Sequence, residues 1–205
     1  MPESIYQKAM GKNWTKLSPS VRRHYDLKAG ESLQVTGVLN HVYHTAILTP
    51  LLQLTGCFGL LFPEQGENVR TVLLNSVGTG TDGQEFVRWE RSLYFKRKDG
   101  TEKLRRFDST VTLFQNDSGT FLLEKIAPNQ AVTFRLSATG DGALRYDSGG
   151  FYSILGSKPV PVPSPAKISI REWSHPTKPN CFQMEFKLSA PFGIAFGYDG
   201  EFSFT

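Results

Sequence analysis

The stretch EFVRWERSLYFKRKDGTEKLRRFDSTVTLFQ, residues 85–115, predicts a β-hairpin. Its first half alternates in the way of a half-buried strand, with one face formed by Val87, Trp89, Arg91, Leu93 and Phe95. Asp99-Gly100 then supplies the residue types of a tight turn, and Lys103 to Gln115 alternates again. We therefore expect two neighbouring antiparallel strands here.

The chain on both sides of this hairpin repeats short alternating runs separated by Gly, Asn, Asp or Pro. Further strands are expected at about 32–43, 69–77, 121–126, 131–138, 143–147, 168–173, 182–188 and 194–204. Regular spacing of this kind is typical of a barrel or a sandwich. The predicted fold is mainly β with minor α: one strongly curved antiparallel sheet or a partial β-barrel.

The chain is expected to form a single domain over residues 1–205. Residues 1–30 form an N-terminal helical segment, with short helices at about 3–10 and 19–26, and residues 31–205 form the barrel-like body. Ser18 is a suitable N-cap and Pro19 suits the first helical position. The proline-rich run 158–165 reads as an extended connection within the same sheet system.

Between the first and second strands lies TAILTPLLQLTGCFGLLFP, residues 45–63, which contains no charged residue. Its Pro50, Gln53 and two glycines, and the lack of a basic flank, argue against an integral membrane span. We expect an apolar helix or lid at about 45–62, with Leu48, Leu51, Leu52 and Phe58 as covering residues. A core helix and an interaction surface are the alternatives.

Alternation places charged or titratable side chains on apolar strand faces, where each needs a partner. Arg91 shares its face with Trp89, Glu172 shares a face with Ile168 and Ile170, and His41 falls with Leu39 on the apolar face of the first strand. Tyr198 lines the last strand. Arg91, Glu172, His41, Trp89 and Tyr198 are the candidate ligand-binding residues, although an internal ion pair would explain Arg91 and a satisfied core histidine would explain His41.

Composition and motifs exclude several classes of protein. The net charge of +4 comes from dispersed residues, so no basic stripe for nucleic acid is present. GTGTDG at 78–83 lacks the Lys-Ser/Thr and the helix of a phosphate-binding loop. Cys57 and Cys181 are expected to be reduced core residues. No metal site, cofactor or secretion signal is indicated, and a cytoplasmic location is the default expectation.

The chain resembles the domain-of-unknown-function 4166 family. The matching residues are Trp14 and Leu17 before Ser18-Pro19-Ser20-Val21-Arg22, His24, Trp89-Glu90-Arg91, Arg106-Phe107 with Ser109, Arg171-Glu172-Trp173, and Phe192-Gly193 leading to Tyr198 and Gly200. The resemblance implies no activity and no catalytic residues. In this family the domain often follows a saccharopine-dehydrogenase-like reductase domain, which implies a separate reductase partner for this chain.

Three functions are compatible with these features. The first is binding of a small hydrophobic or lipid-like molecule in an internal cavity, with Arg91 meeting an anionic head group. The second is an interaction or membrane-peripheral role through the apolar segment at 45–62. The third is an enzyme with His41 or Glu172 as general acid or base and Arg91 stabilising an anion. We rank them in this order, and catalysis is therefore not the expected role.

Overall fold

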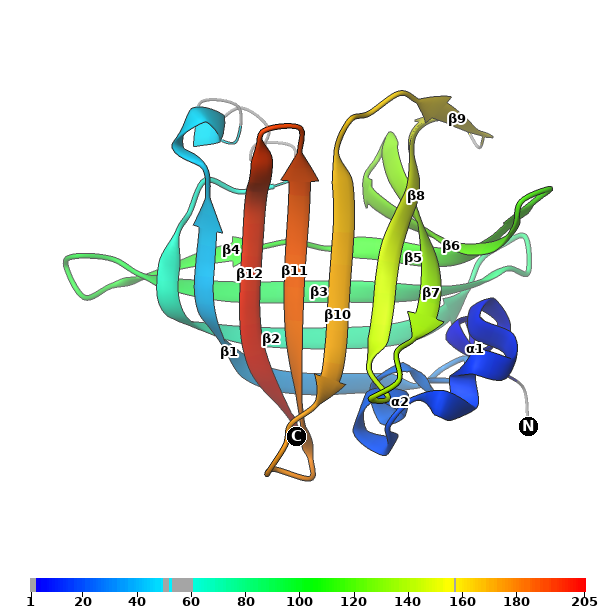
Figure 1. Cartoon of the computed structure of the whole chain (residues 1–205), viewed down its shortest axis with the longest axis horizontal. Helices are drawn as coiled ribbons and strands as arrows, with labels where there is room; N and C mark the ends of the chain where they lie inside the picture. Colours follow the sequence, from blue (N-terminus) through cyan, green and yellow to red (C-terminus); the bar gives the residue numbers. More distant parts are fainter. Residues whose placement is uncertain (1–2, 50–51, 53–60, 157) are drawn as a thin grey trace.

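In the computed structural model, described for residues 3–49, 52, 61–156 and 158–205, all strands belong to one antiparallel sheet (Figure 1). The strands are β1 (Ser32–His44), β2 (Gly66–Thr79), β3 (Glu85–Lys96), β4 (Glu102–Arg106), β5 (Ser109–Asn116), β6 (Gly119–Ala127), β7 (Gln130–Ala138), β8 (Leu144–Leu155), β9 (Lys158–Val162), β10 (Lys167–Ser174), β11 (Cys181–Ala190) and β12 (Gly193–Phe204). The predicted mainly-β class and curved sheet are confirmed.

The sheet closes on itself because β8 also pairs with β10, from Asp147 opposite Ser169 to Leu144 opposite Glu172. Within the described part of the chain, ten strands form the ring in the order β10-β11-β12-β1-β2-β3-β5-β6-β7-β8. β4 and β9 extend beyond it, on β3 and β8 respectively. A ring of ten strands is wider than the eight-stranded barrels whose side chains just fill the interior, so space remains inside.

The predicted N-terminal helices are present as α1 (Ile5–Met10) and α2 (Pro19–Tyr25), joined by the 3₁₀ helix η1 (Gly11–Lys16). Ser4 and Gln7 form a capping box on α1. The second helix begins at Pro19 as predicted, but the Ser18 hydroxyl makes no cap and instead accepts a hydrogen bond from Ser174. Both helices pack against one end of the barrel and supply side chains to its interior (Figure 1).

The predicted lid falls mostly outside the described residues. A 3₁₀ helix, η2 (Ala46–Leu48), follows β1, and Leu52 is buried. Leu51 and Phe58 lie outside the described residues, as does the side chain of Leu48. At the far end of the segment, Phe62 packs edge-on against Phe95 and Phe196. The lid therefore stays a prediction.

The first five residues of the proline-rich run form β9, which within the described residues pairs only with the end of β8. Pro159 and Pro161 have no N–H to donate, so they suit a strand with one free edge. β8 thus continues past the point where it leaves β10, with β7 still paired on one side and β9 on the other (Figure 1).

Candidate functional site

Four of the five predicted ligand-binding residues line a small space inside the barrel. This inner cavity has a volume of about 50 Å³, and Trp89, Arg91, Glu172 and Tyr198 all contribute to its wall. They come from β3, β10 and β12, whose alternate side chains point inward. The structure brings these four residues together, and contact with a ligand stays a prediction.

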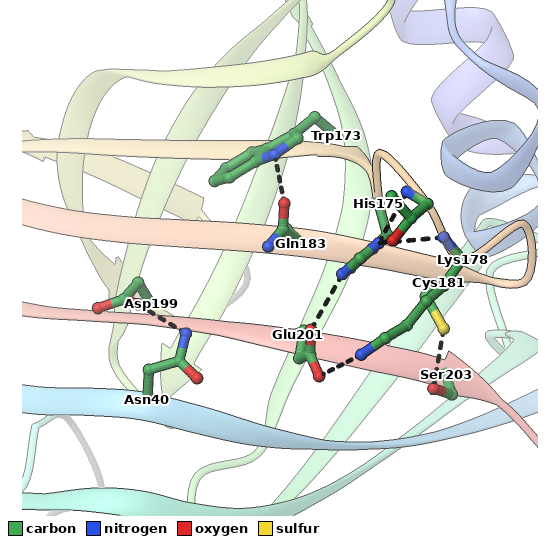
Figure 2. Close-up of polar contacts among 10 residues, drawn as sticks. Asn40, Trp173, His175, Lys178, Cys181, Gln183, Asp199, Glu201 and Ser203 are labelled. Carbon is green, nitrogen blue, oxygen red and sulfur yellow. Dashed lines mark hydrogen bonds and ion pairs between the residues drawn. The ribbon is translucent and has the colours of Figure 1, made fainter.

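The prediction that His41 lies on the inner face is wrong. The pairing of β1 with β12 shifts register between Leu39 and His41, which is a β-bulge. After the bulge the alternation reverses, so Val42 is buried while the His41 side chain is 61% exposed. On the outside of the barrel, His41 and Asn40 both bond the Asp199 carboxylate, at 3.2 and 3.0 Å (Figure 2 shows Asn40 and Asp199).

Arg91 has its ionic partner inside the barrel, but the partner is Glu124 of β6. Arg91 Nη2 lies 3.0 Å from Glu124 Oε1, and Nη1 donates to Ser109 Oγ at 2.9 Å. The Ser109 hydroxyl in turn donates to the same Glu124 oxygen at 2.5 Å. The guanidinium also lies 4.9 Å from the ring centres of Trp89 and Phe107. A buried charge pair needs such additional bonds to offset its lost hydration.

This polar layer keeps unused hydrogen-bonding capacity. Three of the five Arg91 side-chain N–H donors bond protein atoms, the third of them reaching the Phe107 carbonyl at 3.4 Å. Within the described part of the chain, both hydrogen bonds of Glu124 go to Oε1, and none forms at Glu124 Oε2 or at the Tyr198 hydroxyl. The layer therefore carries no net charge but offers both donors and acceptors to the cavity.

Burial and nearby charges shift the pKa of two of these groups. Burial is the main reason that the pKa of Tyr198 rises to about 12, although the Arg91 charge acts in the opposite direction. Burial by itself lowers the pKa of the Arg91 guanidinium, but the Glu124 carboxylate, together with the nearby Tyr198 and Tyr6, makes the net shift upward. At neutral pH the layer therefore holds a charged arginine and a protonated tyrosine.

Glu172 belongs to a separate buried network that joins β10 to α2 and β2. Its Oε1 accepts a hydrogen bond from the Tyr25 hydroxyl at 2.5 Å, and its Oε2 lies 3.1 Å from His24 Nδ1. His24 Nε2 lies 3.0 Å from the Asn75 amide nitrogen, so in this orientation Nδ1 carries the proton that is donated to Glu172. Both Glu172 oxygens are thus occupied, and Glu172 and Arg91 do not pair with each other.

Tyrosine hydroxyls surround the inner cavity. Tyr6 OH accepts a hydrogen bond from Trp89 Nε1 at 2.9 Å. Burial is the main cause that raises the pKa of Tyr6, Tyr25 and Tyr146 well above the usual value, and the neighbouring carboxylates add to it. Together with Tyr198 they are the four interior tyrosines, and all four remain protonated donors at neutral pH.

A larger pocket continues from the polar layer to the barrel end opposite the helices. This outer pocket has a volume of about 490 Å³, within the range of small-molecule sites. It shares six lining residues with the inner cavity: Arg91, Phe107, Glu124, Phe134, Ile170 and Tyr198. Its remaining wall is largely apolar, with Phe151, Phe186 and Leu188, and its outer edge includes Val162, Pro163 and Ser164.

Sequence reasoning missed Glu124, His24 and Tyr25. Glu124 alternates with Leu122 on an inward face, which is the same signal that selected Arg91 and Glu172. His24 and Tyr25 lie on a helix of seven residues, and nothing in their spacing pairs them with a residue almost 150 positions later. Only the packing of α2 on the barrel reveals that contact.

The outer face of β10–β12 carries a second group of polar side chains (Figure 2). Glu201 bonds both Lys178 at 2.8 Å and His175 at 3.2 Å, and the Lys178 bond is the main reason that the pKa of Glu201 is lowered. The core prediction for Cys181 is wrong, because this free cysteine is half-buried on the outer face with its sulfur 3.1 Å from Ser203 Oγ. These contacts hold the turn between β10 and β11 against β12. Cys57, the other predicted core cysteine, lies outside the described residues.

Two kinds of feature are absent from the described ranges. No three histidine, cysteine, aspartate or glutamate side chains there lie close enough together to hold a metal ion. In the same part of the chain, no helix has both the length and the apolar character needed to span a membrane.

The fold and site define a closed antiparallel β-barrel domain with an internal polar layer and an apolar pocket. The model of the family described as "Domain of unknown function (DUF4166)" matches residues 17–202, so the chain belongs to this family, as its motifs indicated. No curated protein matches the chain. Among solved structures, the dehydratase domain of RzxB from Pseudomonas fluorescens is similar at 11% identity over 87% of this chain and 78% of that one, with a TM-score of 0.17, which supports no inference about fold or function.

Proposed function

We propose that the barrel binds a small hydrophobic or lipid-like molecule whose polar end is uncharged. The observation that supports this most is the outer pocket, which leads from the barrel end through aromatic walls to the layer of Arg91, Glu124 and Tyr198. An apolar ligand body gains free energy along such walls, and a few convergent polar groups orient its end.

The electrostatics of the layer refine the expected ligand. An anionic head group would find the Arg91 charge already balanced by Glu124, and it would approach the unpaired Glu124 oxygen. A hydroxyl or carbonyl can instead use the free donor of Tyr198 or the free acceptor of Glu124. We therefore replace the expected anionic head group with a neutral one.

Acid–base catalysis has weaker support than binding. His41 lies outside the barrel, and the two oxygens of Glu172 already accept bonds from Tyr25 and His24. Arg91 forms an ion pair with Glu124, so its charge is already balanced. Presentation of the ligand to a separate reductase remains an expectation from the family resemblance.

The test uses N-phenyl-1-naphthylamine, a neutral apolar fluorophore, displaced by decanol or by decanoate at neutral pH. Fluorescence enhancement with the purified chain is expected, and decanol should displace the probe at a lower concentration than decanoate. Tyr198→Phe should lower the ratio of the displacing concentrations of decanoate and decanol about fivefold, because one hydrogen bond to decanol is lost. Ile168→Trp, which narrows the outer pocket, should weaken probe binding about tenfold.

Leu104→Trp is the matched control, because Leu104 is an exposed apolar residue of β4 that lines neither space. Equal probe binding by the Ile168→Trp and Leu104→Trp variants, both folded by circular dichroism, would contradict the proposed pocket. Preference for decanoate over decanol would contradict the neutral polar end and restore the anionic one.

A further inference from the structure

Exposed large apolar side chains gather at one end of the barrel. Among the described residues, eight such side chains are exposed, and only Leu104 lies on the barrel wall within β4. The other seven lie at the end where β1 stops and β12 starts, opposite the helices (Figure 1). We call these the apolar rim: Tyr43, Ile47, Leu155, Val160, Val162, Phe192 and Ile194.

Strand pairing brings the rim residues together from distant parts of the chain. The end of β1 adjoins the start of β12, where Thr45 N donates to Ala195 O at 3.0 Å. The start of β10 adjoins the end of β11, through Lys167 opposite Ser189. The end of β8 and the paired strand β9 lie at the same end and carry Leu155, Val160 and Val162. Val162 also lines the outer pocket, so the rim borders its mouth.

The charges at this end are mostly positive. The segments 43–49, 61–66, 153–167 and 187–196 contain Lys158, Lys167 and Lys187 and one acid, Glu64, and Lys187 is paired with Glu185 at 2.6 Å. Glu64 is already bound by Lys103 and Arg105, and these partners lower its pKa although its burial acts to raise it. Lys158 and Lys167 are exposed, and neither forms an ion pair within the described ranges.

Apolar and aromatic side chains beside unpaired lysines complement one surface in particular. Tyrosine and phenylalanine can enter the headgroup region of a bilayer, and lysines at the same level are attracted to anionic lipids. Seven exposed apolar residues at one end of the barrel also exceed the scattered apolar exposure of an ordinary surface.

We propose that the apolar rim docks the barrel on the surface of a bilayer that contains anionic lipid, with the mouth of the outer pocket facing the acyl chains. Docking requires only the rim and its lysines, so it goes beyond the proposed ligand binding and can be tested separately. If both occur, an apolar ligand can pass between bilayer and pocket without crossing water.

The experiment measures co-sedimentation of the full chain with vesicles of phosphatidylcholine in which about a third of the lipid is phosphatidylserine. The wild type is expected to sediment with these vesicles, less with pure phosphatidylcholine, and less again at roughly 0.5 M NaCl, where screening is strong. Phe192→Ser with Ile194→Ser should lower the partition coefficient at least about tenfold, because two apolar side chains no longer insert. Lys158→Glu with Lys167→Glu should lower it by at least about tenfold on anionic vesicles only.

Leu104→Ser is the matched control, since it removes an exposed apolar side chain outside the rim and should bind vesicles as the wild type does. Thermal unfolding checks that every variant is folded. The proposal would be overturned if the wild-type protein stayed in the supernatant. It would also be overturned if Leu104→Ser reduced vesicle binding as much as the Phe192→Ser and Ile194→Ser changes do. Self-association that the Phe192/Ile194 variant abolishes, without vesicle binding, would assign the rim to a second copy of the chain instead. The docking-deficient variants should still bind N-phenyl-1-naphthylamine. Retained probe binding shows that the outer pocket is intact, so a failure of docking is distinguished from a failure of the proposed ligand binding.

Discussion

The ion pair between Arg91 and Glu124 gives the sharpest quantitative test of the barrel interior. Arg91 Nη2 and Glu124 Oε1 lie 3.0 Å apart, and the Arg91 and Glu124 side chains are only 14% and 10% exposed. At an effective dielectric constant of about 20, Coulomb attraction at this distance is about 5 kcal/mol. Removing one partner leaves a charge inside the barrel, so Arg91→Met or Glu124→Leu alone should each lower the free energy of unfolding by about 3 kcal/mol.

The double variant should lose much less, about 1 kcal/mol, because it leaves no unpaired charge and adds apolar surface. Urea unfolding followed by tryptophan fluorescence at neutral pH gives the four free energies of a double-mutant cycle, and the coupling energy should exceed about 3 kcal/mol. The exposed pair Arg70–Glu102, at 2.8 Å, is the matched control and should show no measurable coupling, because solvent screens both charges. Additive effects at Arg91 and Glu124, or single losses below about 1 kcal/mol, would refute this reasoning.

Three further predictions concern the interior tyrosines, the buried histidine network and the closest backbone contacts. Above about pH 10 the unfolded chain releases tyrosine protons that the four interior tyrosines retain in the folded state, so stability should fall by about 1.4 kcal/mol per pH unit for each of them. Tyr198→Phe should remove one such contribution between about pH 10 and the folded pKa of about 12, as urea unfolding at several pH values will show; an unchanged slope would contradict the upward shift. Glu172→Leu should lower the stability by at least about 3 kcal/mol in thermal unfolding, because Tyr25 and His24 lose their acceptor. His41→Ala should lower it by less than about 0.5 kcal/mol, and similar losses for the two variants would refute the placement of His24 inside and His41 outside the barrel. Gly37→Ala places a Cβ against the Glu201 carbonyl oxygen and should cost more than about 2 kcal/mol, whereas Gly140→Ala meets no atom within 4 Å and should be nearly neutral. Equal melting temperatures of the two variants would show that the strands can separate without cost.

The strands could be predicted from the sequence because alternation is a local property. Val87, Trp89, Arg91, Leu93 and Phe95 share a face in any extended strand, and burial of their apolar members follows from the hydrophobic effect. The same pattern correctly placed Arg91 and Glu172 inside the barrel. It failed at His41, because a bulge inserts a residue and reverses the alternation without any required residue type.

Partners across the barrel could not be predicted in this way. Arg91 and Glu172 are the two charges that alternation selects, yet the first pairs with Glu124 and the second with His24 and Tyr25. Which charges meet depends on the order of the strands and on where α2 packs. A single sequence contains no measure of either one. The polar layer therefore has no net charge, a property that changes the expected ligand from an anion to a neutral molecule.

By itself the sequence determined that this chain forms a curved antiparallel sheet, because side-chain alternation and turn residues act within a few positions of each other. It also determined which charged side chains would need partners inside the sheet. Only the tertiary structure decided that the sheet closes through β8 and β10, that Glu124 balances Arg91, and that seven exposed apolar residues lie at one end of the barrel. Those features join residues far apart in the chain, and only packing in three dimensions brings such residues into contact.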